Sequence, residues 1–442
     1  MGQLFEPYEP SQRLLLPPSL EDWLPDGHLA RFVSDTVDEL DLEPFLARFR
    51  DREDGRGRIA YHPRMMLKLL IYSYCEGIFS SRKIAAGLHN LVPLRFLAAG
   101  NEPSHRTIAR FRQEHVQHFE RLFVQIVQIA ARSGLLKMGT LAIDGTKLKA
   151  NASKHKAMSY GRMKTAERRL EEEIRRITGL AQGIDDAEDA EFGPDFRGDE
   201  LPKELQRRED RLRVIREAKE RLEREQAAED EASQRGEAEK EGRRGRPLKR
   251  PNGVPEDKKQ SNFTDPESRI LGNPRSGYVQ GYNGQIAVDG AVGVVVAARV
   301  AQCAADSGEL VPMTQAAIQN TKLKPQHVVA DAGYRSEDAF VQLEVMGVDA
   351  HVALGKGERQ ATTPSHAGPA TARMHRKRQT KRSTRIYKRR KAIVEAPFGW
   401  IKSVMGFRTF SLRGLEKVRG EWNLVCLALN LRRMARKLEW VG

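Results

Sequence analysis

Three apolar stretches decide the fold: residues 140–144 (TLAID), residues 282–289 (YNGQIAVD) followed by 292–300, and residues 327–331 (HVVAD). The first and last have the length of buried strands, and each finishes in an aspartate. Between them, Asp289-Gly290 joins two strand-like runs, which is a strong signal for a β-hairpin. The sequence therefore predicts a sheet in which two strands end in a carboxylate.

After the hairpin, apolar residues at helical spacing predict helices at about 308–319 and 336–346, and final helices at about 388–405 and 416–438. A short apolar run at 350–354 predicts a further strand. This order of elements is that of a ribonuclease-H-like α/β fold with a mixed sheet. We expect residues 136–154 and 276–442 to form that domain together.

The rest of the chain reads as helical. In residues 1–135, Pro63 suits a first helical turn and Ser104 can cap a later helix, which predicts an all-α N-terminal domain. Residues 155–275 interrupt the sheet. Two Glu- and Arg-rich segments there, at 163–177 and 205–222, carry apolar residues three and four apart. They predict a coiled-coil-like antiparallel pair with polar linkers, and two independent solvated helices are the alternative.

Composition narrows the class of protein. The 442 residues carry a net charge of +15, which favours a polyanionic partner such as nucleic acid, although a basic proteome is an alternative. The three cysteines, at 75, 303 and 426, form no CxxC pair, which argues against a zinc site or a disulfide framework and fits a reducing cytoplasm. We see no signal peptide and no run of about 18 apolar residues, so we expect no membrane partner.

Three acidic residues suggest a metal site. Asp144 and Asp331 end apolar strands, and if those strands are neighbours their side chains emerge at one edge of the sheet. Glu395 lies on a late helix. Taken alone, each acid is more typical of a turn or a solvated helix. Together, in a strongly basic chain, they favour two Mg²⁺ or Mn²⁺ ions per site, which is the arrangement that attacks a phosphodiester.

Several segments resemble the DDE-type transposases of bacterial insertion sequences. AIDGTKLKANASK (142–154), VVADAGYRSED (328–338) and the segment that begins RRKAIVEAPFGW (389–434) are similar to the regions around the first Asp, the second Asp and the Glu of that family. SNFTDPESRIL (261–271) and the N-terminal YHPRMMLKLLIYSYCEGIFSSRKIA (61–85) are also similar. The resemblance covers nearly the whole chain except much of 160–255.

The resemblance implies catalytic, metal-binding roles for Asp144, Asp331 and Glu395. It also implies that Lys402, seven residues after the Glu, holds a phosphate; an ordinary surface lysine is the alternative. The related Y-R-E-K signature places Tyr seven and Arg four residues before the Glu. Lys388 and Lys391 occupy those positions here, whereas Tyr387 and Arg390 lie one residue earlier. All four are candidate DNA contacts, and the shift leaves open whether a DNA hairpin forms.

Two further basic regions are candidates for DNA binding. Residues 371–391 contain eleven Lys or Arg and no acid, and we expect a basic loop that contacts backbone phosphates. The helix after Ser104 carries Arg106, Arg110 and Arg112, which suits a recognition helix in a DNA-binding domain. A helical packing module with basic decoration fits that pattern equally well.

The sequence therefore predicts a transposase that binds the terminal inverted repeats of an insertion sequence. We expect it to cleave DNA by two-metal hydrolysis and to transfer 3′-hydroxyl ends into target DNA. We further expect a homodimer or larger assembly on DNA, no small-molecule substrate, and a cytoplasmic protein that joins the nucleoid through DNA. The alternatives are a transposase-derived DNA-binding protein without cleavage, and a nuclease of the same fold that does not join strands.

Overall fold

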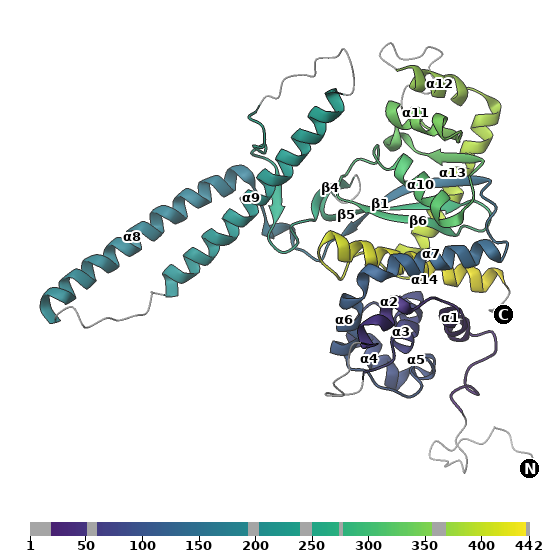
Figure 1. Cartoon of the computed structure of the whole chain (residues 1–442), viewed down its shortest axis with the longest axis horizontal. Coiled ribbons are helices and arrows are strands. Elements are labelled where there is room, and N and C mark those ends of the chain that lie inside the picture. The colour runs from purple at the N-terminus through teal and green to yellow at the C-terminus, as the bar shows by residue number, and fades with distance from the viewer. Residues whose placement is uncertain are drawn as a thin grey trace, which may run out of the picture.

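The computed structural model describes residues 19–50, 60–192, 203–238, 250–273, 277–355 and 368–438. Figure 1 shows a mixed sheet with its helices, a helical N-terminal part below it, and two long helices that extend to one side. Within the described ranges, none of the helices combines the length and the apolar character of a membrane span.

The sheet has six strands in the order β4-β5-β1-β7-β8, with β6 paired to β5. β1 is antiparallel to β5 and parallel to β7, and β7 is parallel to β8. The ribonuclease-H-like mixed sheet is therefore confirmed. The strands are β1 (Thr140–Lys149), β4 (Arg269–Asn273), β5 (Gly277–Asp289), β6 (Val295–Ala301), β7 (His327–Ala330) and β8 (Asp349–Val352), with a separate pair β2 (Ala157–Ser159) and β3 (Gln260–Asn262).

The predicted hairpin is present, but β5 is longer than the sequence suggested. Its second half pairs with β6, and its first half pairs with β4. At the turn, the Asp289 side chain accepts a hydrogen bond of 2.9 Å from the amide of Lys137, which ties the hairpin to the segment before β1.

Helix α14 lies between the sheet and the N-terminal helices. Its Trp422 donates a hydrogen bond of 3.1 Å from Nε1 to the carbonyl of Gln285 in β5. Its Asn430 side chain pairs with both backbone polar groups of Val295 in β6, at 2.8 and 2.7 Å. On the other side, Tyr74 donates to Glu421 at 3.3 Å. One cluster of buried apolar side chains consequently runs from the N-terminal helices through α14 into the sheet.

The helices on either side of α14 match most of the expected positions. α3 begins at Pro63, and the Ser104 side chain caps α6 by accepting from the amide of Thr107. The N-terminal helices are α1 (Leu29–Asp38), α2 (Glu43–Arg50), α3 (Pro63–Cys75), α4 (Ser81–Asn90), α5 (Val92–Leu97), α6 (His105–Glu114) and α7 (Phe119–Arg132). Those of the sheet domain are α10 (Leu310–Thr321), α11 (Glu337–Val345), α12 (Pro369–Arg378), α13 (Lys381–Gly399) and α14 (Leu415–Lys437).

The expected basic loop at 371–391 is helical instead, so that prediction was wrong. It consists of most of α12 and the first half of α13, which begins where Thr380 accepts a hydrogen bond from the amide of Ser383. Acidic partners make a helix of such high charge possible. Glu337 accepts from the amide of Ala370 at 2.7 Å, and Glu344 binds Arg373 at 3.0 Å.

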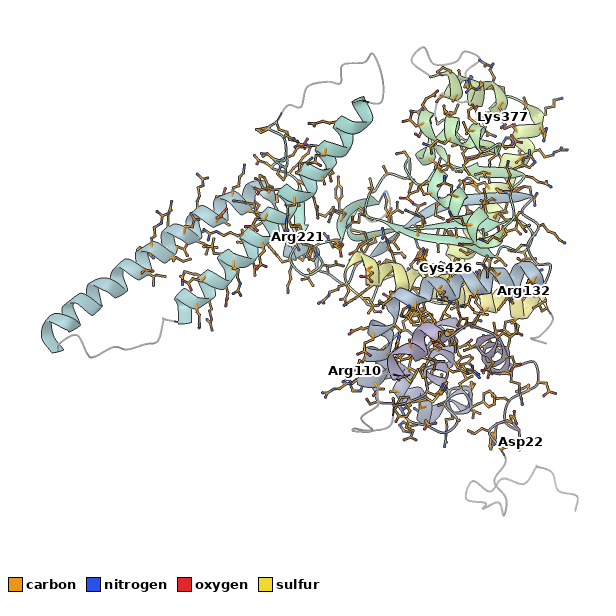
Figure 2. The ribbon with its side chains drawn as sticks, in the orientation of Figure 1. Asp22, Arg110, Arg132, Arg221, Lys377 and Cys426 are labelled. Atoms are coloured by element: carbon orange, nitrogen blue, oxygen red, sulfur yellow. The ribbon has the colours of Figure 1, made fainter. Side chains whose placement is uncertain are left out.

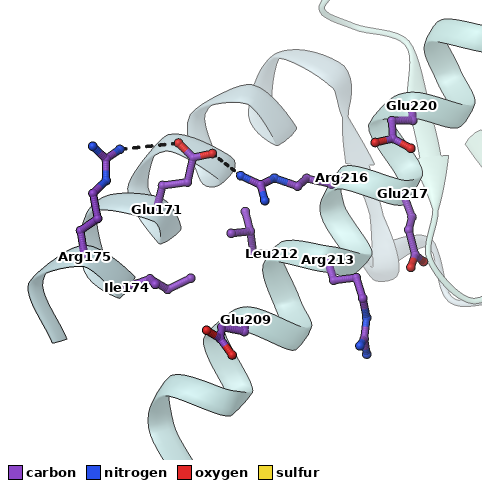
Figure 3. Close-up of a pocket in the computed structure, with 9 residues that line it drawn as sticks. All are labelled: Glu171, Ile174, Arg175, Glu209, Leu212, Arg213, Arg216, Glu217 and Glu220. Carbon is purple, nitrogen blue, oxygen red and sulfur yellow. Dashed lines mark hydrogen bonds and ion pairs between the residues drawn. The ribbon is translucent and has the colours of Figure 1, made fainter. Parts of the chain in front are cut away.

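The insertion forms the expected pair of antiparallel helices, α8 (Tyr160–Phe192) and α9 (Lys203–Ala238). They share a separate small core, and ion pairs such as Glu173–Arg208 at 3.0 Å cross between them. Figure 3 shows Ile174 and Leu212 facing the gap between the helices while Glu171 reaches Arg216 across it. The core residues are Tyr160, Met163, Leu170, Leu212, Ile215, Ala218 and Leu222.

Candidate active site

Asp144 lies in the middle of β1, and not at its end as the sequence suggested. The strand continues to Lys149 because it pairs with β5 along its length, with Asp144 opposite Ile286. The parallel pairing with β7 stops much earlier, at Ala142 opposite Val329. Asp144 therefore projects just beyond the point where β7 ends.

Asp331 follows β7 directly. Its carboxylate accepts a hydrogen bond of 2.8 Å from the amide of Gly333 and so caps the short helical turn Ala332–Tyr334. Because β1 and β7 are parallel neighbours, Asp144 and Asp331 emerge at the same edge of the sheet, as expected. The two carboxylates are close enough that Asp331 raises the pKa of Asp144.

Asp144 carries a strongly perturbed carboxyl group. Burial raises its pKa to about 6, Arg390 opposes this, and the carboxylates of Asp331 and Asp306 add to it. Arg390 forms an ion pair of 3.1 Å with Asp144, and the side chains of both are largely buried. A buried carboxylate among like charges favours a bound cation.

Asp306 is a fourth acidic residue at this site, and the sequence did not indicate it. Its carboxylate accepts hydrogen bonds from the side-chain amides of Asn283 at 2.7 Å and Gln285 at 2.6 Å, both on β5. A Cβ added to Gly145 would lie 2.9 Å from an Asp306 oxygen, so this carboxylate packs directly against β1 beside Asp144. Asp306 lies in the connection between β6 and α10, where no periodic pattern marks it.

Tyr334 is buried beneath Asp144, Asp306 and Asp331, which together form an acidic cluster. Its buried hydroxyl donates to the side-chain oxygen of Gln285. Burial raises the pKa of Tyr334 strongly, and the carboxylates of Asp306, Asp144 and Asp331 raise it further. The phenol therefore stays neutral and holds Gln285 so that its amide faces Asp306.

Glu395 lies on α13 and is exposed to solvent. Within the described residues, no hydrogen bond or ion pair joins Glu395 to Asp144 or Asp331, and these three do not bring their oxygens within 4.8 Å of one another. The three predicted carboxylates are thus on neighbouring elements, with two of them together and the third apart.

Lys402 lies close to the aspartates. The backbone changes from α-helix to π-helix at Trp400–Val404, after Pro397 inside α13. Burial lowers the pKa of Lys402, Arg408 lowers it further, and the charge of Asp144 opposes both. Lys402 is therefore a partly buried cation that the negative charge of Asp144 stabilises.

The other basic candidates on α13 fall into two groups. Lys388 and Lys391 are exposed. Tyr387 is half-buried, with the Arg378 guanidinium 4.0 Å above its ring and that of Arg390 at 5.9 Å. Lys388 and Lys391, at the signature positions, are thus on the surface, whereas Tyr387 and Arg390, one residue earlier, lie at the acidic cluster.

The candidates on α6 also separate. Arg106 and Arg110 are exposed one turn apart, and Figure 2 shows Arg110 projecting away from the helical part. Arg112 points the other way and is 7% exposed. Its guanidinium donates to the Tyr74 hydroxyl at 3.0 Å and to the carbonyl of Phe79 at 2.8 Å. Arg112 therefore makes structural contacts in the core, in place of the expected contact with DNA.

The donor set fits hard divalent cations. Asp144, Asp331 and Asp306 gather carboxylates at one edge of the sheet, although their oxygens do not all lie within 4.8 Å of one another. Carboxylate oxygens are the ligands that Mg²⁺ and Mn²⁺ prefer. Burial first, and then the charges of Asp331 and Asp306, raise the pKa of Asp144, so its ionised form lacks stabilisation that a bound cation could supply.

Comparison with known sequences gives two matches. Residues 254–431 match the family described as "Transposase DDE domain", and residues 18–114 match "Transposase domain (DUF772)". The first match includes Asp306, Asp331, Glu395 and Lys402; Asp144 precedes it, on a strand that the insertion separates from the rest. No curated protein and no solved structure matches the chain. Both matched families are transposase families, and the two matches are consistent with a DDE-type transposase of an insertion sequence.

Proposed function

We propose that this transposase binds the terminal inverted repeats of its insertion sequence, cleaves the DNA at the ends and transfers the resulting 3′-hydroxyls into target DNA. The observation that carries the proposal is the meeting of Asp144 and Asp331 at one sheet edge, where burial and neighbouring carboxylates raise the pKa of Asp144 to about 6. Such a group is poised to exchange a proton for a metal ion.

Asp144 and Asp331 would hold the cations from the sheet, and Glu395 would complete the site from α13. When bound, two divalent ions help to deprotonate the attacking hydroxyl and to neutralise the leaving oxygen. Asp306 keeps its oxygens beside Asp144 through Asn283 and Gln285. It thereby adds negative potential that attracts the cations.

Arg390 and Lys402 are cations beside this edge, since the charge of Asp144 affects the pKa of both. Arg390 neutralises Asp144 in the absence of metal, at 3.1 Å. When metal replaces it as the partner of Asp144, the guanidinium can turn to a phosphate oxygen of the bound DNA. Lys402 is placed to hold a second phosphate oxygen as a point charge.

We assign DNA contacts outside the cluster to exposed cations on two elements. Lys388 and Lys391 on α13 would contact the backbone next to the cleaved bond, and Arg106 and Arg110 on α6 would contact the inverted repeat. Residues 1–135 would then form the DNA-binding domain. Residues 136–154 with 269–442 would form the catalytic domain, because β4, which the sequence assigned to the insertion, belongs to the sheet. The inserted pair of helices within 155–275 would join two copies, because the two ends of the element must be held together.

The test is a cleavage and joining assay. The purified full-length protein is incubated with Mg²⁺, DNA that carries the flanking inverted repeats, and a supercoiled target. We expect cut ends and joined products, and loss of both in Asp144→Asn, with Asp35→Asn (an exposed aspartate on α1) as the matched control. Cleavage without joining would identify a nuclease, and binding without cleavage would identify a DNA-binding derivative. Cleavage that survives in Asp144→Asn would overturn the assignment of the site.

A further inference from the structure

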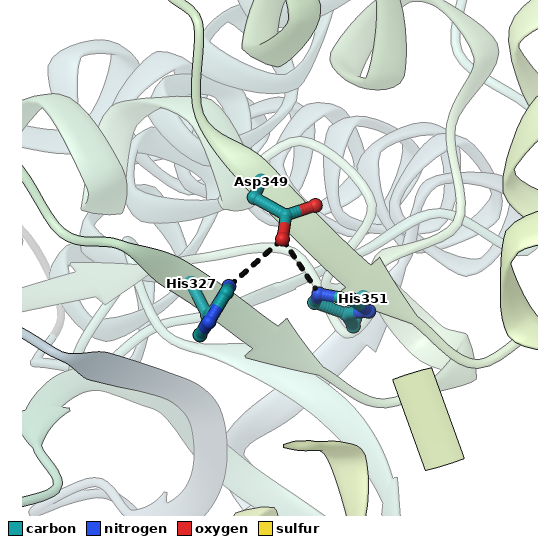
Figure 4. Close-up of side chains that lie close together, drawn as sticks. All are labelled: His327, Asp349 and His351. Carbon is teal, nitrogen blue, oxygen red and sulfur yellow. Dashed lines mark hydrogen bonds and ion pairs between the residues drawn. The ribbon is translucent and has the colours of Figure 1, made fainter. Parts of the chain in front are cut away.

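Three potential metal ligands converge at β7 and β8, outside the aspartate cluster. His327 is the first residue of β7 and lies directly opposite Asp349, the first residue of β8; His351 follows two residues later on the same face of the strand. His327 Nδ1 lies 2.8 Å and His351 Nε2 lies 3.1 Å from Asp349 Oδ2. Figure 4 shows both rings pointing at this one oxygen.

We propose that His327, Asp349 and His351 bind one transition-metal ion, with Zn²⁺ the best fit. Ligands about 2.0–2.1 Å from a tetrahedral zinc ion lie about 3.3 Å from one another. The two distances, 2.8 and 3.1 Å, are hydrogen-bond lengths somewhat below this value, and all three donor atoms lie within 4.8 Å of one another, so a small outward shift of the rings would admit the ion. Two imidazoles and one carboxylate select zinc over magnesium, and water can take the fourth position.

The surroundings of the ligands also suit a metal site. His351 is 2% exposed, and its other ring nitrogen, Nδ1, pairs with Ser383 Oγ at 2.9 Å. Lys377 binds the second oxygen of Asp349, Oδ1, so Oδ2 remains directed at the two rings. Hydrogen bonds of this kind, on the far side of a ligand, orient ligands in metal sites.

Two cations bind the Asp349 carboxylate, and the positive charge of each opposes a metal ion. Arg382 lies 3.9 Å from Asp349 Oδ2, but its side chain is 71% exposed and can turn into solvent. Lys377 is 35% exposed and can keep its contact with Oδ1. A cation of charge +2 bound to Oδ2 would therefore displace one surface arginine and leave the rest of the cluster in place.

The ion would attach two helices to the sheet. Lys377 is in α12 and Ser383 is in the first turn of α13, and both bind the ligands directly. α13 then runs on to Arg390 and Glu395, and β7 runs on to Asp331. The proposed ion is thus a structural one that fixes the start of α13 without contacting DNA. This inference does not depend on the proposed function.

Co²⁺ is the probe for the test, because four-coordinate Co²⁺ absorbs visible light strongly and occupies zinc sites. The full-length protein is stripped with a chelator and titrated with Co²⁺ in excess Mg²⁺, which saturates the carboxylate cluster. We expect one equivalent of strongly absorbing Co²⁺ that Zn²⁺ displaces. The signal should disappear in His327→Ala and Asp349→Asn. It should persist in Asp144→Asn and in His155→Ala, a control at an exposed histidine.

Ser383→Ala keeps all three ligands, and we expect it to weaken Co²⁺ binding about tenfold through loss of the bond to His351. Circular dichroism of each variant separates loss of the site from loss of the fold. The His327 side chain is 18% exposed at the first residue of β7, and we expect its replacement to leave the fold intact. Absence of the signal in the unmutated protein would overturn the proposal. So would a signal that survives in folded His327→Ala but disappears in Asp144→Asn, since the metal would then belong to the aspartates.

Discussion

Arg390 and Asp144 form an ion pair of 3.1 Å across 246 residues of sequence, and it joins α13 to β1 at the acidic cluster. The guanidinium keeps the pKa of Asp144 below the value that burial alone would impose. In Arg390→Ala that pKa should rise further, so the pH dependence of cleavage should move to higher pH. Rate profiles at saturating DNA across the neutral range measure the shift. Arg385→Ala, an exposed arginine of the same helix, is the control; equal profiles for both variants would contradict a link between Arg390 and Asp144.

The raised pKa of Asp144 also predicts how pH affects stability. Its value is about 6 in the folded protein against 3.8 when unperturbed. Since the folded value is the higher one, the contribution of this group to stability is present at low pH and is lost as pH rises through about 6. The loss is about 3 kcal/mol at most. Mg²⁺ should therefore raise the melting temperature more at about pH 8 than at about pH 5, because it binds the ionised form.

Calorimetry with and without Mg²⁺ at the two pH values tests this. In Asp144→Asn the pH dependence of the Mg²⁺ effect should be much reduced, whereas Asp35→Asn should behave as the unmutated protein. An equal effect of Mg²⁺ at both pH values would show that the cation does not bind through Asp144.

Asp306 allows charge to be separated from hydrogen bonding. Asp306→Asn can keep the oxygen that accepts from Asn283 and Gln285, so it should fold normally. Because it removes a negative charge, it should raise the Mg²⁺ concentration needed for half-maximal cleavage. Asp306→Ala removes the Asp306 acceptor of the Gln285 amide and leaves the Asn283 amide only its longer bond of 3.3 Å to the carbonyl of Cys303, which should also cost about 1–3 kcal/mol of stability. If Asp306→Asn cleaved with an unchanged Mg²⁺ requirement, Asp306 would have only a structural role.

The two faces of α6 should respond differently to mutation. Arg106 and Arg110 are exposed, so their replacement by Ala should weaken binding to the inverted repeat. The slope of the logarithm of the binding constant against the logarithm of the salt concentration should fall by about 1 for each arginine replaced. Arg112→Ala should instead lower stability by about 2 kcal/mol, because it removes the buried partner of Tyr74 and Phe79. Binding titrations at several salt concentrations, with melting curves, separate the two effects. A large change in salt dependence for folded Arg112→Ala would contradict the buried role.

The strands β1, β5, β6, β7 and β8 could be predicted because alternating or continuous apolar runs and the Asp289-Gly290 turn are local signals. The strands β2, β3 and β4 were missed, since all three lie within the stretch that was expected to be a helical insertion. The end of β1 could not be predicted either, since its continuation depends on pairing with β5, far along the chain. The burial of Arg112 depends on Tyr74 and Phe79 from other helices, which the basic pattern of α6 does not reveal. Asp306 lies in an irregular connection and is defined only by its distant partners. The His327 and His351 cluster has the same origin: parallel strands place far-separated residues side by side.

The inserted helices give a last prediction, in which two adjacent residues serve as variant and control. Ile215 is 2% exposed in the small core between α8 and α9, whereas Val214 is 41% exposed. Ile215→Glu should separate the two helices, because a buried charge and the lost apolar contacts together cost about 3–5 kcal/mol. This core is separate from that of the sheet, so the rest of the protein should stay folded. If the insertion joins two copies, light scattering of the DNA complex should show a smaller assembly for Ile215→Glu and an unchanged one for Val214→Glu. Proteolysis within 155–275 would confirm that the helix pair is lost in Ile215→Glu. If the DNA complex of that variant then has the same size as that of the unmutated protein, the insertion does not join the two copies.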